Sequence, residues 1–365
     1  MQSSGIKRIS SVNQRNMPGK IAIFCATLER GGAERTTINL ADFFVRHGVA
    51  CDIITSSNPK EDEYPTPDGV VRICAGGKGV LKLRRAITQS RPDILIIMTT
   101  PSCIFAIPAC IGMKLKTVVS ERSAPKQAKI KMITKFLSHF FLRFADGFIF
   151  QTEDAKRYYD RLLHGRGTVI PNALLSDKFP ELCLEGTRKK EIVSVGRLNP
   201  LKRHDMLIEA FSRLPHEYRD YTLTIFGEGT YRTTLEKLII KKNLQDRVRL
   251  LGVRPDVLEQ IRMSALFVLS SDYEGMPNAL LEAMALGLPC ISTDCPCGGP
   301  RSVIENGVNG VLIPVGDVEA LTEAITEILG ADEKASRMGQ NAVKIREILD
   351  AEVIHHRWME YLKSI

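Results

Sequence analysis

Short apolar runs alternate with longer amphipathic stretches along most of the chain. Residues 20–26 and 94–98 are apolar runs of strand length, and residues 33–47 carry apolar side chains at helical spacing before Gly48 ends the stretch. Continuous apolar runs are typical of strands that are covered on both faces. Strands that alternate with helices in this way form a parallel sheet wrapped by helices. We therefore predict an α/β fold.

The alternation is interrupted by a charged, loop-like stretch at residues 173–190. At 365 residues the chain is long enough for two domains with separate cores. We predict two Rossmann-like parallel-sheet domains, at residues 20–172 and 191–345, joined by this linker. Residues 1–19 are polar, and we expect them to form a disordered tail with no secretory signal.

Residues 94–113 contain no charged side chain and are long enough on paper to span a bilayer. Pro101 and Pro108 interrupt this stretch, and residues 99–102 have the composition of a turn. We therefore predict a buried strand at residues 94–98 followed by a core helix, in preference to a membrane span.

Residues 265–293 follow a strand, loop, helix, turn and strand pattern. Pro277 is suited to the first position of the helix, and Gly287 with Pro289 ends it. The first amides of this helix, at residues 278–280, have no partner within the helix and favour an anion, especially a phosphate.

Two carboxylates flank this predicted anion site: Glu274 in the loop and Glu282 within the helix. A carboxylate beside a phosphate accepts hydrogen bonds from hydroxyls such as those of ribose and hexose rings. One phosphate site with two hydroxyl acceptors indicates a nucleotide-sugar site. Alternatively, both glutamates are solvated surface charges.

Two further groups of candidate residues follow predicted strands, at the edge where ligands bind in parallel sheets. Gly31 and Gly32 either let the backbone approach a phosphate or sugar closely or form a plain turn. Arg197 and Lys202 suit a diphosphate leaving group, although alone they would indicate a salt-bridged loop. The chain contains no Asp-x-Asp sequence, so we expect a reaction without a metal ion.

Glu274 and Glu282, with Gly-Met-Pro-Asn-Ala-Leu-Leu between them, resemble the E-x7-E motif of the retaining GT4 glycosyltransferases of GT-B fold. Other motifs stand in the family's order across residues 20–345: Gly31-Gly32-Ala33-Glu34, Pro171-Asn172, Val195-Gly196-Arg197 with Lys202, and Asn306-Gly307-Val308-Asn309-Gly310. The resemblance implies two facing domains with an interdomain cleft, the first on the acceptor side and the second binding the donor. It also implies that a final helix, at residues 346–365, crosses back to the first domain.

The resemblance assigns roles to individual residues. Glu282 is expected to hold the ribose, Glu274 the hydroxyls of the donor sugar, and backbone near Gly252 to border the nucleobase. The expected catalytic residues are Arg197, Lys202 and Glu274. The expected donor-binding residues are Gly31, Gly32, Arg197, Lys202, Gly252, Glu274, Gly275, Met276, Pro277, Asn278, Ala279, Leu280 and Glu282. No cofactor or metal is expected, because the UDP-sugar is a substrate.

The chain departs from the family near residues 120–122, where many GT4 enzymes carry a histidine that contacts the transferred sugar. Ser120, Glu121 and Arg122 stand there instead. Glu121 or Arg122 takes over a contact to the sugar or to an acceptor phosphate, or the two form an ion pair within the loop.

Residues 126–144 place apolar and aromatic side chains on one helical arc, with Lys126, Lys129, Lys131 and Lys135 nearby. Such a helix either lies on an anionic membrane surface or packs on the sheet. Several GT4 relatives use a helix like this one to meet polyprenyl-diphosphate acceptors, which keeps the membrane hypothesis open.

Net charge and cysteine content limit the classes of partner and the cellular compartment that we expect. The formal net charge of +8 favours an acidic partner, but no basic-aromatic strand motif or helix-turn-helix indicates nucleic acid. The nine cysteines show no disulfide spacing, which fits a reducing cytosol. We expect a cytoplasmic protein, peripheral on the cytoplasmic face of the inner membrane.

The sequence therefore predicts a retaining, metal-independent glycosyltransferase. It would move a hexose or N-acetylhexosamine from a UDP-sugar to a hydroxyl of a polyprenyl-diphosphate-linked saccharide in bacterial surface-polysaccharide synthesis. Two alternatives remain: a non-catalytic nucleotide-sugar-binding subunit, and a nucleotide-sugar 2-epimerase of the same fold.

Overall fold

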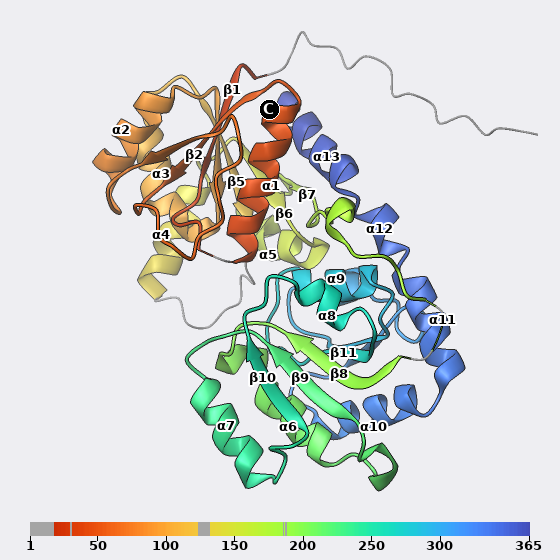
Figure 1. Ribbon diagram of the computed structural model, residues 1–365. Helices are drawn as coiled ribbons and strands as arrows, with labels where there is room; N and C mark the ends of the chain where they lie inside the picture. Colours follow the sequence, from red (N-terminus) through yellow and green to blue (C-terminus); the bar gives the residue numbers. More distant parts are fainter. Residues whose placement is uncertain (1–17, 30, 123–131, 185, 187) are drawn as a thin grey trace, which may run out of the picture.

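The computed structural model describes residues 18–29, 31–122, 132–184, 186 and 188–365. They form two parallel β-sheets, each flanked by helices (Figure 1). The α/β fold predicted from the alternating pattern is confirmed. Most of the predicted N-terminal tail, residues 1–17, lies outside the described residues.

The first sheet has seven parallel strands in the order β3-β2-β1-β4-β5-β6-β7. Its strands are β1 (Lys20–Phe24), β2 (Ala50–Thr55), β3 (Val71–Cys74), β4 (Ile94–Met98), β5 (Lys116–Glu121), β6 (Gly147–Phe150) and β7 (Thr168–Val169). The helices between them are α1 (Gly32–Arg46), α2 (Val80–Ser90), α3 (Cys103–Cys110), α4 (Met132–Leu142) and α5 (Glu153–Leu163).

The second sheet has six parallel strands in the order β10-β9-β8-β11-β12-β13. Its strands are β8 (Lys189–Val195), β9 (Thr222–Phe226), β10 (Val248–Gly252), β11 (Ser264–Leu269), β12 (Cys290–Thr293) and β13 (Val311–Ile313). The helices that follow are α6 (His204–Ser212), α7 (Arg232–Lys241), α8 (Val257–Ile261), α9 (Asn278–Ala285), α10 (Val318–Leu329), α11 (Asp332–Ala342), α12 (Ile345–Ile348) and α13 (Ala351–Ser364).

Residues 94–113, the apolar stretch considered above as a possible membrane span, are divided between separate elements in the structure. Residues 94–98 form β4, a central strand whose five residues are all buried, and the helix after it, α3, has only eight residues. No helix among the described residues is long and apolar enough to cross a bilayer.

The last helix, α13, packs on the first sheet although the elements before it belong to the second (Figure 1). The Tyr361 hydroxyl accepts a hydrogen bond from the Phe148 amide at 2.8 Å, and Arg357 donates to the Val169 carbonyl at 2.7 Å. Trp358 is almost fully buried in a core cluster that includes Phe43 and Ile149 of the first sheet's layers. The chain therefore passes between the two sheets twice.

Candidate functional site

An open cavity of about 550 Å³ lies between the two domains, beyond the carboxyl ends of the strands. Thirteen of the residues singled out in the sequence line it: Gly31, Gly32, Arg122, Arg197, Lys202, Gly252, Glu274, Gly275, Met276, Pro277, Asn278, Ala279 and Glu282. These residues come from five separate segments of the chain, so the fold brings nearly all of the predicted site together.

Two of the expected site residues do not line this cavity. Leu280 has a fully buried side chain within the core, and its amide donates to the Pro277 carbonyl at 3.1 Å. Glu121 is also buried, and it accepts a hydrogen bond from the Tyr159 hydroxyl at 3.3 Å. Because neighbouring residues of a strand point to opposite faces, Arg122 can face the cavity while Glu121 faces α5.

A short capped turn presents Lys202 to the cavity. Asn199 caps a single 3₁₀ turn at Pro200–Lys202, its side-chain oxygen accepting from the Lys202 amide at 3.2 Å. The hydroxyl of Ser270, at the end of β11, donates to the Lys202 carbonyl at 3.0 Å. The ammonium group then lies 2.5 Å from Glu274 Oε1.

The loop that carries Glu274 is held from both sides. Ser271 donates its hydroxyl to Glu274 Oε1 at 2.6 Å. A Cβ atom placed on Gly299 would lie 1.8 Å from the Gly275 carbonyl oxygen, so only glycine allows the neighbouring loop to pack so closely. Both charges of the Lys202–Glu274 pair therefore lie on preformed loops.

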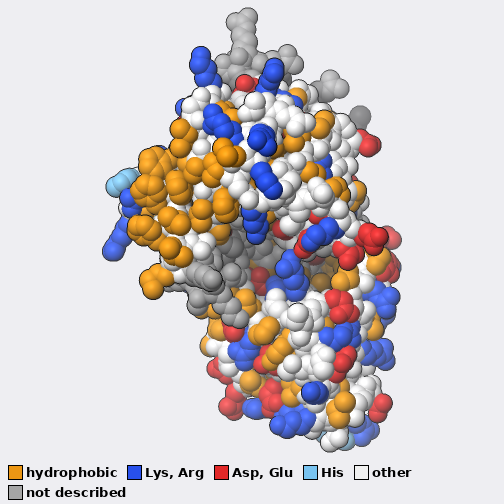
Figure 2. All heavy atoms as spheres, turned by 90° about the vertical axis from the view of Figure 1, so that its left-hand side faces the viewer, with side chains coloured by type: hydrophobic (Ala, Val, Ile, Leu, Met, Phe, Trp, Pro, Cys, Tyr) orange, Lys and Arg blue, Asp and Glu red, His pale blue; other side chains and the backbone are white. Residues whose placement is uncertain are grey.

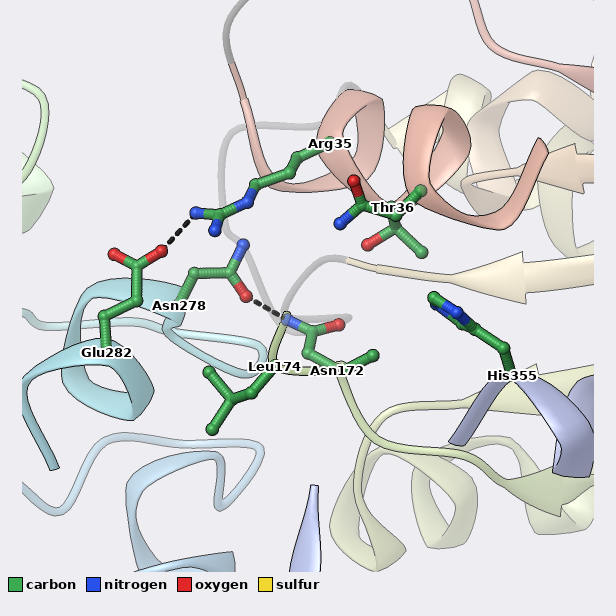
Figure 3. A pocket seen from close by; sticks show the side chains of 9 residues that line it. Arg35, Thr36, Asn172, Leu174, Asn278, Glu282 and His355 are labelled. Carbon is green, nitrogen blue, oxygen red and sulfur yellow. Dashed lines mark hydrogen bonds and ion pairs between the residues drawn. The ribbon is translucent and has the colours of Figure 1, made fainter. Parts of the chain in front are cut away.

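Pro277 is not the first residue of α9, as predicted, but its N-cap, with an extended backbone. Asn278 opens the helix, and its side-chain oxygen accepts a hydrogen bond from Asn172 at 2.7 Å (Figure 3). The Asn172 side chain also donates to the Met276 carbonyl at 3.0 Å and accepts from Arg122 at 2.8 Å. This buried asparagine thus joins the first domain to the loop before α9.

Arg35 forms an ion pair with Glu282 across the two domains (Figure 3). Arg35 lies in the first turns of α1, just after Gly31 and Gly32, whereas Glu282 lies on α9. Burial opposes the charge on Arg35, but the carboxylate of Glu282 outweighs it, and the pKa of Arg35 is raised. A hydroxyl that binds Glu282 must share it with this guanidinium.

The cavity carries a net positive charge. Five cationic side chains line it, Arg35, Arg122, Arg197, Lys202 and Arg254, against three carboxylates, Glu228, Glu274 and Glu282. Burial lowers the pKa of Arg122 to about 9, which leaves its guanidinium charged at neutral pH. Burial and the nearby Lys202 lower the pKa of His204 to about 4, so this imidazole is neutral. The arrangement favours an anion such as a diphosphate.

Comparison with known families decides the identity of the chain. The model described as "Glycosyltransferase Family 4" matches residues 30–174, and the model described as "Glycosyl transferases group 1" matches residues 179–345. The chain belongs to the GT4 family of glycosyltransferases. The two matches adjoin within the predicted linker and together include every strand of the two sheets of this GT4 protein except β1.

Relatives of this GT4 chain come from archaea and bacteria. An uncharacterized glycosyltransferase of Methanocaldococcus jannaschii is 30% identical over 250 residues, which cover 62% of this chain and 61% of the relative. The chain thus spans about three fifths of that relative's length. An enzyme of Campylobacter jejuni is 25% identical over 364 residues, covering 95% of this chain and 99% of the relative. Its name is GalNAc-alpha-(1->4)-GalNAc-alpha-(1->3)-diNAcBac-PP-undecaprenol alpha-1,4-N-acetyl-D-galactosaminyltransferase.

Among solved structures, Anabaena HepE in complex with UDP matches with a TM-score of 0.80 at 18% identity, covering 95% of this chain and 100% of HepE. At this identity the match concerns the fold alone. It confirms the predicted GT-B architecture, with two facing Rossmann-like domains and a cleft between them.

Some residues that line the cavity of this GT4 protein were missed from sequence, among them Arg35, Tyr64 and Arg254. Of these residues, Arg35 could have been predicted most easily, because it follows directly on the Gly31-Gly32-Ala33-Glu34 motif at the start of α1. A side chain one turn into a helix that opens on a ligand cleft lies close to that cleft. Tyr64 and Arg254 lie in loops without any such signal.

Proposed function

We propose that this protein transfers a hexose or N-acetylhexosamine from a UDP-sugar to a hydroxyl of a polyprenyl-diphosphate-linked saccharide, with retention of anomeric configuration. The observation that carries the proposal is that one interdomain cavity holds the Lys202–Glu274 pair, Arg197 and Glu282 together. A nucleotide sugar needs cations for its diphosphate and carboxylates for its hydroxyls, and both kinds of group converge there.

In this proposal, different residues bind different parts of the donor. Glu282 accepts hydrogen bonds from the ribose hydroxyls, and Glu274 accepts them from the sugar. Arg197, Lys202 and the amides of Asn278 and Ala279, the first two residues of α9, stabilise the departing diphosphate. The acceptor oxygen bonds to the anomeric carbon on the face that the nucleotide leaves, the bond from that carbon to the phosphate oxygen breaks, and the leaving diphosphate takes the hydroxyl proton.

Arg122 is our candidate for a contact to the acceptor or the donor phosphate. Its Nε donates to the Ser120 hydroxyl at 2.8 Å and one terminal nitrogen donates to Asn172 at 2.8 Å. The other terminal nitrogen is buried without a hydrogen-bond partner among the described residues. A buried charged donor that is left unpaired is costly, so a ligand oxygen is the expected partner.

Names of related proteins support the choice of substrates. The Campylobacter jejuni relative is named as an N-acetyl-D-galactosaminyltransferase acting on a saccharide linked to diphospho-undecaprenol. The structural neighbour HepE is described in complex with UDP. Both fit the donor and the acceptor class proposed here.

The reaction is tested by following the release of nucleotide diphosphate in EDTA from a panel of UDP- and GDP-sugars. We expect release from one UDP-sugar, increased by a synthetic polyprenyl-diphosphate-linked saccharide. Donor binding without release would favour the non-catalytic alternative, and conversion of one nucleotide sugar into another would favour the epimerase.

Replacing Glu282 with glutamine should weaken the binding of that UDP-sugar by roughly tenfold to a hundredfold, because a charged acceptor of the ribose hydroxyls is lost. Affinity is measured by calorimetry. The matched control is Glu323→Gln, an exposed glutamate on α10 far along the chain from the site. Unchanged affinity in the Glu282 variant would remove the ribose role.

We also propose that α4 lies on an anionic membrane surface. Met132 and Phe136 expose 86% and 70% of their area, and Ile133, Phe140 and Phe144 are exposed beside them. Figure 2 looks onto this side of the first domain and shows hydrophobic side chains gathered above the cleft, with Lys and Arg along the border. Lys135 and Arg143 line the same groove as Phe136. Lys126, Lys129 and Lys131 lie outside the described residues.

An Ile133→Ser, Phe136→Ser double variant should lower the binding of vesicles made of phosphatidylethanolamine and phosphatidylglycerol by at least about tenfold, because two apolar anchors are lost. Co-sedimentation measures this binding. Ile240→Ser, at a similarly exposed isoleucine on α7, serves as the control. Equal binding by all three proteins would show that α4 does not meet the membrane.

A further inference from the structure

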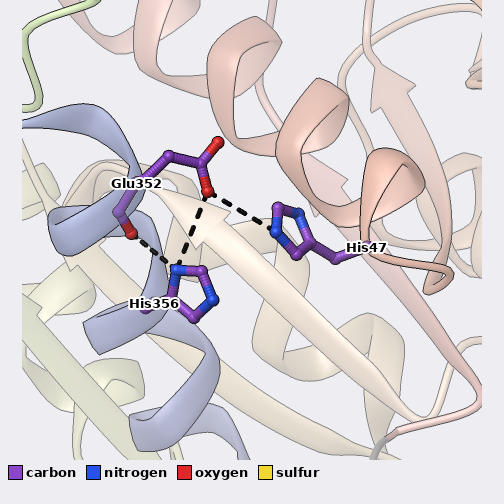
Figure 4. A group of neighbouring side chains, drawn as sticks. All are labelled: His47, Glu352 and His356. Carbon is purple, nitrogen blue, oxygen red and sulfur yellow. Dashed lines mark hydrogen bonds and ion pairs between the residues drawn. The ribbon is translucent and has the colours of Figure 1, made fainter. Parts of the chain in front are cut away.

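Two histidines and a glutamate meet where the end of α1 touches α13 (Figure 4). His47 caps the carboxyl end of α1, and Glu352 and His356 lie one turn apart on α13. Each side chain offers a ligand atom, and these atoms all lie within 4.8 Å of one another. The proposed transfer reaction uses none of the three.

The hydrogen bonds of the two imidazoles leave their outer nitrogens as acceptors. Nδ1 of His47 lies 2.8 Å from the Phe43 carbonyl, and Nδ1 of His356 lies 2.7 Å from the Glu352 carbonyl. A carbonyl oxygen only accepts, so Nδ1 carries the proton and a neutral ring keeps its lone pair on Nε2. Metal-binding histidines are held by backbone carbonyls in this way.

The lone pair of His47 faces a carboxylate. Its Nε2 lies 3.5 Å from Glu352 Oε2, too long for a good hydrogen bond. Two ligands of one tetrahedral zinc ion stand about 3.4 Å apart, given metal–ligand distances of about 2.0–2.2 Å. The 3.5 Å separation is close to this value. His356 approaches the same carboxylate oxygen, with its Nδ1 3.8 Å from Glu352 Oε2. A change of rotamer would bring its Nε2 to the ion, and the three side chains are 30% to 50% exposed and so have room to move.

The surrounding charges favour a cation. Arg46 binds Glu352 through Oε1 at 3.0 Å, which leaves Oε2 for the histidines, and it also binds Asp42 at 2.9 Å. One arginine between two carboxylates leaves a net charge of −1 beside two imidazoles. A divalent ion would therefore enter a site that is already negative.

We propose that His47, Glu352 and His356 bind one divalent transition-metal ion, with Zn²⁺ as the best match to two imidazoles and a carboxylate, and that this ion fastens α13 to α1. Water would complete the coordination. Arg35 and His47 are twelve residues apart on α1, or about 18 Å at the rise of a helix, so the ion would take no part in sugar transfer.

The test is calorimetric titration of the full chain, first treated with chelator, with Zn²⁺ alone. We expect one ion per chain and a rise in the melting temperature on the order of 5 °C at a hundredfold excess over the dissociation constant. In His356→Gln and in Glu352→Gln the affinity at this site should fall at least about tenfold, and the rise should disappear. Both positions are about half exposed, so these variants are expected to fold.

His216→Gln, at an exposed histidine outside the cluster, is the matched control and should bind Zn²⁺ as the wild type does. Melting curves in EDTA would establish that all variants fold equally well. Undiminished Zn²⁺ affinity in the His356 and Glu352 variants would overturn the proposal, since the ion would then be bound elsewhere. The proposal would also be overturned if the wild type did not bind Zn²⁺ at concentrations about 100-fold lower than those at which free histidine binds it.

Discussion

Replacing Lys202 with alanine is expected to lower kcat/KM for the UDP-sugar by about 10²–10³-fold. The ammonium group lies 2.5 Å from Glu274 Oε1 and faces the cavity proposed to hold the diphosphate. Its charge is worth most when the bond to the sugar breaks and negative charge builds up on the leaving group. The loss should therefore fall mainly on kcat, measured from initial rates of nucleotide release.

A matched control separates this effect from the loss of any lysine ion pair. Lys190 pairs with Asp220 on the surface of the same domain, and Lys190→Ala should leave the rate unchanged. Lys202→Arg should restore part of the rate, because it keeps the charge. If Lys202→Ala raised KM alone, the residue would bind the donor without favouring the transition state.

Replacing Asn172 with alanine should lower the free energy of unfolding by about 2–4 kcal/mol, since buried groups in both domains lose their partner. Its side chain makes four hydrogen bonds, to the Met276 carbonyl, Asn278, Arg122 and Gln151, at 2.7–3.0 Å. Unfolding in urea measures the change. The transfer rate should fall too, because Met276 and Asn278 line the donor cavity.

Asn172→Asp provides a sharper test of the same network. Aspartate keeps an acceptor for Arg122 but turns an oxygen toward the Met276 carbonyl, where a donor is needed. It should therefore be no more stable than the alanine variant. Asn341→Ala, at a partly exposed asparagine on α11, is the control. A change below about 0.5 kcal/mol in both Asn172 variants would mean that this junction is not held by hydrogen bonds.

The sequence was most informative where a residue's role follows from its local pattern. The apolar run at residues 94–98 could be identified as a buried strand, and that strand is β4. Glu274 and Glu282 could be placed on one ligand site because strand, loop and helix follow one another directly, and both line the same cavity. In each case the decisive neighbours lie within about one element of the chain.

Contacts between segments that are far apart in the sequence could not be predicted from local patterns. Arg35 and Glu282 are 247 positions apart, and nothing in the sequence around either residue specifies the other.

The position of Glu121, by contrast, could have been predicted from the sequence. Strand periodicity puts Glu121 and Arg122 on opposite faces, so only one of them was able to face the cleft. Leu280 is a similar case, because helical phase turns its side chain into the core while Ala279 faces the cavity.

The position of α13 has a consequence for the order in which the protein folds during synthesis. Residues 20–169, which carry all seven strands of the first sheet, leave the ribosome long before Ile354, Trp358 and Leu362, which complete the core packed against that sheet. Domains generally fold as they emerge, amino-terminal first. Part of the apolar core of the domain made first therefore stays exposed until α13 has been synthesised.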